Sequence, residues 1–321
     1  MWGVLPSRYL FDPNNMRWGL GAYDICFKNK PASTFFSLGQ TLPTQRLRYS
    51  PHGGLFQPTL TQCIRLLSRG PFSHHNVPSD TASLTPPADP LSEPRTVSPT
   101  EHQHQRGLPD PFTDALLTYS TTGTDTFPAP SAYASRAHSW IHIFPEGKIH
   151  QHPQKIMRYF KWGVARLILE SEPCPDVVPV WVEGLDDVMW DGRGWPRWLP
   201  RAGKDVSVTF GERVDVESRF GDLRERWKRL VEHEEIVKSK EQERGGQVLA
   251  MGELTDTLKY GEEAVELRKE CTMRVREEVL RLRRGRGHSD EDPKAGYAET
   301  WALEGPGQQG VQADGSRIRD V

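Results

Sequence analysis

The chain has 321 residues, enough for one α/β domain with extensions or for two small domains. Only 36% of the residues are hydrophobic, and 26 prolines and 28 glycines indicate a modest core diluted by solvated segments. The formal net charge of -2 gives no global field for binding nucleic acid, and no apolar run is long enough to span a membrane. The four cysteines form no C-x-x-C pair, which argues against a zinc site or a disulfide framework.

Composition changes along the chain predict five regions. Residues 70–138 are rich in Pro, Ser, Thr and His and should form a disordered low-complexity insertion, because they cannot bury enough apolar surface to fix their backbone. This insertion separates two globular parts, residues 1–69 and 139–218. A charged helical extension follows over residues 219–286, and residues 287–321 form a polar, disordered tail.

The second globular part alternates strand and helix patterns. Residues 140–144 alternate and predict a strand, and apolar residues at helical spacing predict an amphipathic helix over 154–170. Further strands are expected at 177–182 and 206–210. Pro179 cannot donate to a strand ladder, so it should lie at an edge, a bulge or the working end of its strand. The order indicates an α/β fold of the βαβ type, a mixed sheet flanked by helices.

The helical extension should be broken near Gly245–Gly246. Its basic end, Arg281 to Arg286, suits the negative end of a helix dipole and is best interpreted as a solvated face. The alternative is contact with acidic lipid headgroups.

One candidate phosphate site runs from Gly39 to Arg46. It combines a glycine turn, a proline and an arginine, whose planar fork can donate two parallel hydrogen bonds to a phosphate. Taken alone, an ordinary surface arginine in a loop explains Arg46 better, and Arg48 is an equally placed rival.

A second candidate is Phe144-Pro145-Glu146-Gly147, where a predicted strand ends in a turn. Ligands of open α/β sheets bind at the carboxyl ends of strands, and Gly147 would let the backbone approach a ligand closely. Chance could produce the four residues, but their position between a strand and a helix favours a binding site.

The flanks of this motif carry a resemblance to a known family. Residues 1–69 and 139–215 resemble the tafazzin family of the glycerolipid acyltransferase superfamily, through these segments: Met1–Gly3, Asn14–Trp18, Asp24–Phe27, Phe35–Gly39, Trp140–Lys148, Met157–Val164, Val178–Trp181, Glu183–Asp186 and Pro200–Lys204. The insertion and the C-terminal region lie outside this resemblance.

The family orders four sequence blocks, and the resemblance implies roles for three of them here. Gly39 and Arg46 belong to the second block, Phe144 to Gly147 to the third, and Pro179 to the fourth. Together they imply binding of a glycerophosphate acceptor. The resemblance further implies acyl transfer between phospholipids and lysophospholipids, including cardiolipin, by a peripheral protein of mitochondrial membranes facing the intermembrane space. It implies no acyl-CoA, metal or other cofactor.

The family's first block, His-x4-Asp, has no match in the expected place. The one occurrence of this spacing is His75 to Asp80, which follows the arginine block, lies in the insertion and contains Pro78. His142 alternates with two isoleucines and is expected to be structural, and His150 and His152 are expected to be exposed. The catalytic base that the family's His-x4-Asp block supplies is therefore predicted to be missing. The chain as written should have little or no acyltransferase activity.

Two hypotheses remain open from the sequence. The chain is either part of a family member whose first block is missing from this sequence, or a short form that binds lipid headgroups or partners without catalysis. Four tryptophans, Trp18, Trp190, Trp195 and Trp198, are candidates for an interfacial belt, although ordinary packing explains each of them at least as well.

Overall fold

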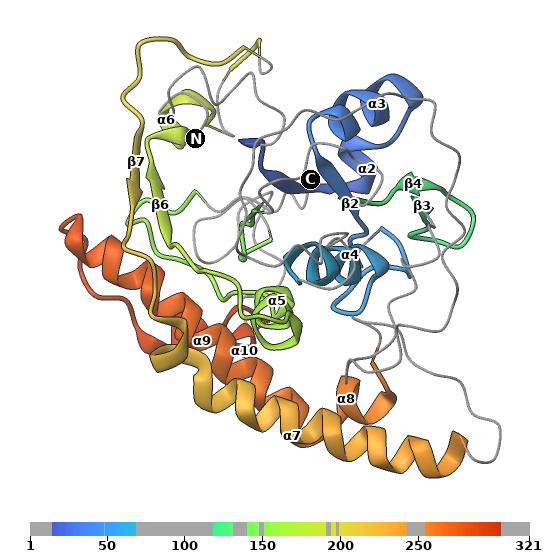
Figure 1. Ribbon diagram of the computed structural model, residues 1–321. Coiled ribbons are helices and arrows are strands. Elements are labelled where there is room, and N and C mark those ends of the chain that lie inside the picture. The colour runs from blue at the N-terminus through green and yellow to red at the C-terminus, as the bar shows by residue number, and fades with distance from the viewer. Residues whose placement is uncertain are drawn as a thin grey trace, which may run out of the picture.

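The computed structural model describes residues 15–47, 49–68, 118–130, 140–147, 151–190, 194–196, 199–242 and 254–302. Its N-terminal half is built on a three-stranded parallel sheet in the order β2-β1-β5 (Figure 1). The strands are β1 (Trp18–Ala22), β2 (Thr41–Thr44) and β5 (Ile141–His142).

Two helices connect β1 to β2, so the βαβ unit lies here: α2 (Tyr23–Cys26) and α3 (Lys30–Leu38). The Asn29 side chain caps α3 by accepting a hydrogen bond from the backbone N–H of Ala32 at 3.0 Å. In the parallel register Gly19 pairs with both Thr41 of β2 and His142 of β5. All three strands therefore end at the same edge of the sheet.

The sequence placed the βαβ unit between the strands at 140–144 and 177–182, and this prediction is wrong. The first strand is shortened to Ile141–His142, whereas the second begins later, as β6 (Val180–Glu183), and belongs to another sheet. There β6 pairs antiparallel with β7 (Ser207–Phe210), which matches the strand expected at 206–210. The short helix α6 (Leu185–Val188) lies between them in the chain.

The predicted helix over 154–170 is confirmed only in its second half, α5 (Gly163–Glu170). Residues 154–162 are irregular, and Lys155 has a φ of 55°. Helix α5 is buried on every side from Val164 to Leu169. It packs against α4 (Pro58–Leu67) and contributes Leu167 to a small core with residues of the parallel sheet.

The other face of α5 belongs to the larger hydrophobic core, which the C-terminal helices complete. These are α7 (Val216–Gln242), α8 (Asp256–Tyr260) and α9 (Glu262–Gly285), followed by the turn η5 (Pro293–Gly296) and α10 (Ala298–Ala302). Figure 1 shows α7 and α9 side by side beneath α5. Their core side chains include Phe220, Leu223 and Leu267, each fully buried. The described residues of this extension are largely helical, and Gly245–Gly246 lie outside the described part of the chain.

The basic end of α9 is largely exposed, as expected for a solvated face, with Arg283 as the exception. Arg283 is buried, with 1% of its side chain exposed. Arg281 pairs with Glu278 at 2.7 Å, Arg284 with Glu277 at 2.7 Å and Arg286 with a carboxylate of β6 at 3.0 Å. Arg281 and Arg284 pair within α9 and Arg286 reaches β6, so the solvated-face interpretation is corrected only for Arg283.

Part of the predicted insertion is structured. Residues 118–130 form a hairpin of β3 (Thr118–Tyr119) and β4 (Phe127–Pro128). Phe127 is 8% exposed and packs edge-on against the ring of Phe27 at 5.4 Å. The prediction of disorder therefore fails for these residues. The remaining insertion residues, with His75 and Asp80, lie outside the described part of the chain.

Candidate acceptor site

The carboxyl edge of the parallel sheet brings two of the predicted blocks together. Arg46 follows β2 by two residues, and Phe144 follows β5 by two residues. Because β2 and β5 flank β1 in parallel, both segments leave the sheet at the same edge. Ligands of open parallel sheets bind at this edge, so both segments lie where such a sheet would bind a ligand.

Arg46 is held by an acidic partner that the sequence did not predict. Its Nε donates to Asp24 Oδ1 at 2.9 Å and its Nη2 donates to Asp24 Oδ2, while its guanidinium lies 4.5 Å from the Tyr49 ring centre. The hydrogen bond from Arg46 lowers the pKa of Asp24 despite partial burial. This arrangement orients the guanidinium and leaves Nη1 outside the ion pair. Asp24 lies just after the end of β1. This position was the sequence feature that could have identified it as a partner of Arg46.

Gly39 lies at the other end of β2. It ends α3 with an ordinary φ of -80°, and the unusual φ of 52° belongs to Gln40 instead. Four strand residues separate this turn from the carboxyl edge. The structure therefore does not bring Gly39 to Arg46, and Arg48 lies outside the described residues.

Phe144 to Gly147 form a tight turn. The Gly147 N–H donates to the Phe144 carbonyl at 3.0 Å, and Gly147 has a φ of 65°, which favours glycine. The Lys161 N–H donates to the Pro145 carbonyl at 2.7 Å and ties the turn to the segment before α5. The Phe144 side chain is 64% exposed. The turn thus presents an aromatic ring to solvent while its glutamate faces inward.

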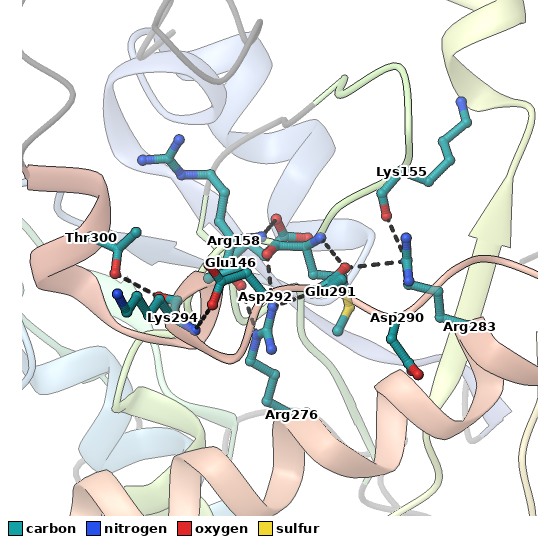
Figure 2. Close-up of polar contacts among 12 residues, drawn as sticks. Glu146, Lys155, Arg158, Arg276, Arg283, Asp290, Glu291, Asp292, Lys294 and Thr300 are labelled. Atoms are coloured by element: carbon teal, nitrogen blue, oxygen red, sulfur yellow. Dashed lines mark hydrogen bonds and ion pairs between the residues drawn. The ribbon is translucent and has the colours of Figure 1, made fainter.

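Glu146 is the most perturbed carboxyl group of this region. Its Oε2 accepts the Arg158 N–H at 3.0 Å. Burial raises the pKa of Glu146 to about 7, against the lowering effects of that hydrogen bond and of the Arg276 and Arg158 charges. The group is therefore close to half protonated at neutral pH. Figure 2 shows it beside Arg158, with Arg276 and Glu291 close by.

Pro179 lies in a different part of the fold. It is buried just before β6, and its carbonyl accepts the Gly211 N–H at 2.9 Å. The proline therefore occupies the start of its strand, as its missing N–H requires. It belongs to the two-stranded sheet, and the described contacts do not join it to Arg46 or Glu146.

The described histidines of this region provide no evident base. Burial, followed by the charge of Arg17, lowers the pKa of His142 to about 4, and its ring lies 4.6 Å from the Phe144 ring. His152 Nδ1 accepts the Gln154 N–H at 3.1 Å, and His150 lies outside the described residues. His142 is thus a neutral packing residue at pH 7.

Three of the four tryptophans considered for an interfacial belt lie in the described part of the chain. Trp18 is 1% exposed and belongs to the core, so it is not an interfacial residue. Trp190 and Trp195 are 40% and 90% exposed, and Trp198 lies outside the described residues. Across the described residues, no helix has the length and apolarity needed to cross a membrane. No group of three or more His, Cys, Asp and Glu in that same part of the chain could hold a metal ion.

Sequence comparison decides the family. The chain is 32% identical to a tafazzin of Saccharomyces cerevisiae over 94% of its own length and 67% of that protein. The chain belongs to the tafazzin family. It is also 24% identical to a tafazzin of Drosophila melanogaster, over 70% of this chain and 39% of that protein. An N-acylphosphatidylethanolamine synthase of Arabidopsis thaliana is 24% identical, over 68% of this chain and 51% of that protein. No family model matches the chain.

The yeast comparison also corrects the expected extent of the resemblance. Only about 6% of the chain lies outside a match that covers 94% of it, which is fewer residues than the 24 of α9. The match therefore includes at least part of α9, which the sequence interpretation left outside the family. This agrees with the packing of α9 on α5 in the larger core.

Proposed function

We propose that this tafazzin-family chain provides the acceptor-binding residues of a phospholipid–lysophospholipid transacylase that remodels cardiolipin and related phospholipids. The single observation that carries the proposal is the position of Arg46 and the Phe144–Gly147 turn at the same carboxyl edge of one parallel sheet. The names of the relatives, tafazzin and N-acylphosphatidylethanolamine synthase, support the acyl-transfer chemistry.

In this proposal Arg46 binds the phosphate of the acceptor. Asp24 and Tyr49 orient the guanidinium, and the Nη1 group outside the ion pair donates to a phosphate oxygen. Phe144, exposed beside this edge, contacts the glycerol or the first methylenes of the acyl chain. For Gly39 and Pro179, a role in acceptor binding rests on the family resemblance alone. Pro179 would act by shaping the second sheet.

Glu146 is proposed to contact the glycerol hydroxyls. With a pKa of about 7, its carboxyl is neutral for part of the time at physiological pH. A neutral carboxyl donates a hydrogen bond to a hydroxyl and does not repel a nearby phosphate. Burial therefore makes this glutamate compatible with an anionic acceptor.

The proton of the acceptor hydroxyl needs a base that these residues do not supply. General base catalysis contributes about 10²- to 10⁴-fold, so the 321-residue chain alone should transfer acyl groups very slowly. The test is acyl exchange from phosphatidylcholine to lysocardiolipin in vesicles. It compares this chain with one extended at its N-terminus by a segment carrying His-x4-Asp. Equal activity of the two proteins would refute the claim that this chain lacks its catalytic base. No activity in either would favour the alternative, headgroup binding without catalysis.

Arg46→Gln in the extended chain tests the acceptor site itself. Loss of a charge-assisted hydrogen bond to phosphate should raise KM for the lysophospholipid about tenfold or more and leave the fold intact. The matched control is Arg213→Gln, because Arg213 also pairs with a carboxylate, Asp176, at 3.2 Å, but on an exposed surface. A KM unchanged by Arg46→Gln would reject Arg46 as the phosphate ligand.

The family resemblance further supports a peripheral location on mitochondrial membranes, facing the intermembrane space. Exposed Trp190 and Trp195 have the amphipathic rings that suit a headgroup layer. Fractionation of mitochondria tests this part of the proposal, and recovery of the protein wholly outside the membrane fraction would contradict it.

A further inference from the structure

The irregular segment 154–158 is held by α9 in place of its own helical hydrogen bonds. Arg283 donates to the carbonyls of Gln154 at 3.1 Å and Lys155 at 2.9 Å. Arg276 donates to the carbonyls of Met157 at 2.8 Å and Arg158 at 3.1 Å. Four carbonyl groups that would accept N–H groups in a helix are therefore bound by two guanidinium groups. Figure 2 shows Arg283 at the Lys155 carbonyl.

Glu291, which follows α9 in the chain, forms ion pairs with both of these arginines. Its Oε2 accepts Arg276 Nη2 at 2.6 Å, and its Oε1 lies 3.1 Å from Arg283 Nε. The same Oε1 accepts the Met157 N–H at 2.7 Å. All three side chains are at most 3% exposed. A buried charge without a partner is strongly destabilising, so the three side chains have one favoured arrangement.

One peptide group connects this cluster to the acceptor turn. The Met157 carbonyl and the Arg158 N–H belong to the same planar trans peptide, so they point in opposite directions. Arg276 binds the carbonyl side at 2.8 Å, and Glu146 Oε2 accepts the N–H side at 3.0 Å. Rotation of this peptide would break both contacts at once. The position of Glu146 is thereby coupled to the Arg276 guanidinium on a helix more than a hundred residues away in sequence.

We propose that Arg276 and Glu291 are positioning residues for the acceptor-binding turn, acting through the Met157–Arg158 peptide on Glu146. The inference rests on the proposed role of that turn in binding a glycerophosphate. Arg276 and Glu291 do not touch the acceptor themselves. They orient the donor that fixes the Glu146 carboxylate.

The test uses the full chain and sn-glycerol 3-phosphate as the probe, with binding followed by NMR of 13C-labelled glutamate side chains. Arg276→Met should weaken binding about tenfold, because Glu146 loses its fixed donor. It should also raise the pKa of Glu146, because the Arg276 charge and the Arg158 N–H both lower it. Glu291→Gln should weaken binding in the same direction but lower the pKa of Glu146, because the Glu291 charge raises it.

Arg268→Met is the matched control. Arg268 also lies on α9, is fully buried and donates to two backbone carbonyls, those of Leu258 at 2.9 Å and of Lys259. Its contacts do not lead to Glu146, so this variant should lose stability but keep both the affinity and the Glu146 titration.

The outcomes separate the two proposals. If the wild-type chain fails to bind the probe, the acceptor site is refuted, and the positioning role falls with it. If the wild type binds and Arg276→Met binds equally well, only the positioning role is refuted. Equal losses of affinity in Arg276→Met and Arg268→Met, with the Glu146 titration unmoved, would show general damage to the fold and would also refute it.

Discussion

Glu146 should make the stability of this protein depend on pH. Its pKa rises from 4.5 to about 7 on folding, so the folded state binds more protons than the unfolded state between these values. The free energy of unfolding therefore falls as the pH rises through this window, and the full loss is reached above about pH 7. A shift from 4.5 to about 7 corresponds to at most about 3 kcal/mol, and solvent screening at this partly exposed residue reduces the figure.

Glu146→Gln removes this titration. The amide oxygen can still accept the Arg158 N–H, but the side chain no longer ionises. Near pH 4.5, where the wild-type carboxyl is mostly protonated in the folded state, the two proteins should have similar stability. At about pH 8 the variant should be more stable by about 1–3 kcal/mol. Urea unfolding followed by tryptophan fluorescence, repeated across this pH range, measures the difference.

Glu225→Gln is the control for this prediction. Glu225 lies exposed on α7, and replacing it should leave the pH dependence of stability unchanged. The reasoning would be refuted if the stability difference between Glu146→Gln and the wild type were the same at about pH 5 and about pH 8. It would also be refuted if the variant became less stable than the wild type as the pH rises.

Two further predictions test the packing of the fold. Arg166→Met should cost about 3–5 kcal/mol in urea unfolding, because it leaves Glu170 as an unpaired charge; their 2.7 Å ion pair is almost fully buried. Adding Glu170→Gln should recover part of this loss, and no recovery would contradict the ion-pair explanation. Gly184→Ala and Gly123→Ala start from the same φ of 85°, but a Cβ at Gly184 would lie 2.0 Å from a backbone oxygen, whereas Gly123 has open space. Gly184→Ala should therefore lower stability by about 2 kcal/mol more than Gly123→Ala, and equal melting temperatures would exclude the clash.

Sequence patterns located the acceptor turn and missed the sheet that supports it. Phe144 to Gly147 follow a strand in a tight turn, as expected from Pro145 and Gly147. The central strand β1, Trp18–Ala22, escaped notice because its two glycines interrupt the apolar pattern. Gly21 is needed for close packing, since a Cβ there would lie 2.7 Å from the Thr41 side chain on β2. Gly21 thus weakens the strand pattern in the sequence but permits β1 to pair closely with β2.

The helical spacing of apolar residues before α5 correctly predicted buried side chains, but it wrongly predicted a helix in that segment. Phe160 and Val164 are buried in the larger core, as the periodicity required, whereas Ile156 is only half-buried. Of these three residues only Val164 lies in a helix. Periodicity reports which side chains face the core, and the backbone conformation depends on where its carbonyl groups find donors. Here arginines of α9 supply those donors in competition with the helix.

The geometry of the acceptor turn therefore depends on residues that no local pattern around it contains. The Arg276 contact with Met157 spans 119 residues, and the Glu291 contact spans 134. A four-residue block locates the turn because proline and glycine act within the turn itself. The orientation of Glu146 requires a peptide held on its far side by a buried guanidinium. Substitutions deep in α9 can consequently alter acceptor binding without touching the acceptor, and a purely local motif would predict them to be neutral.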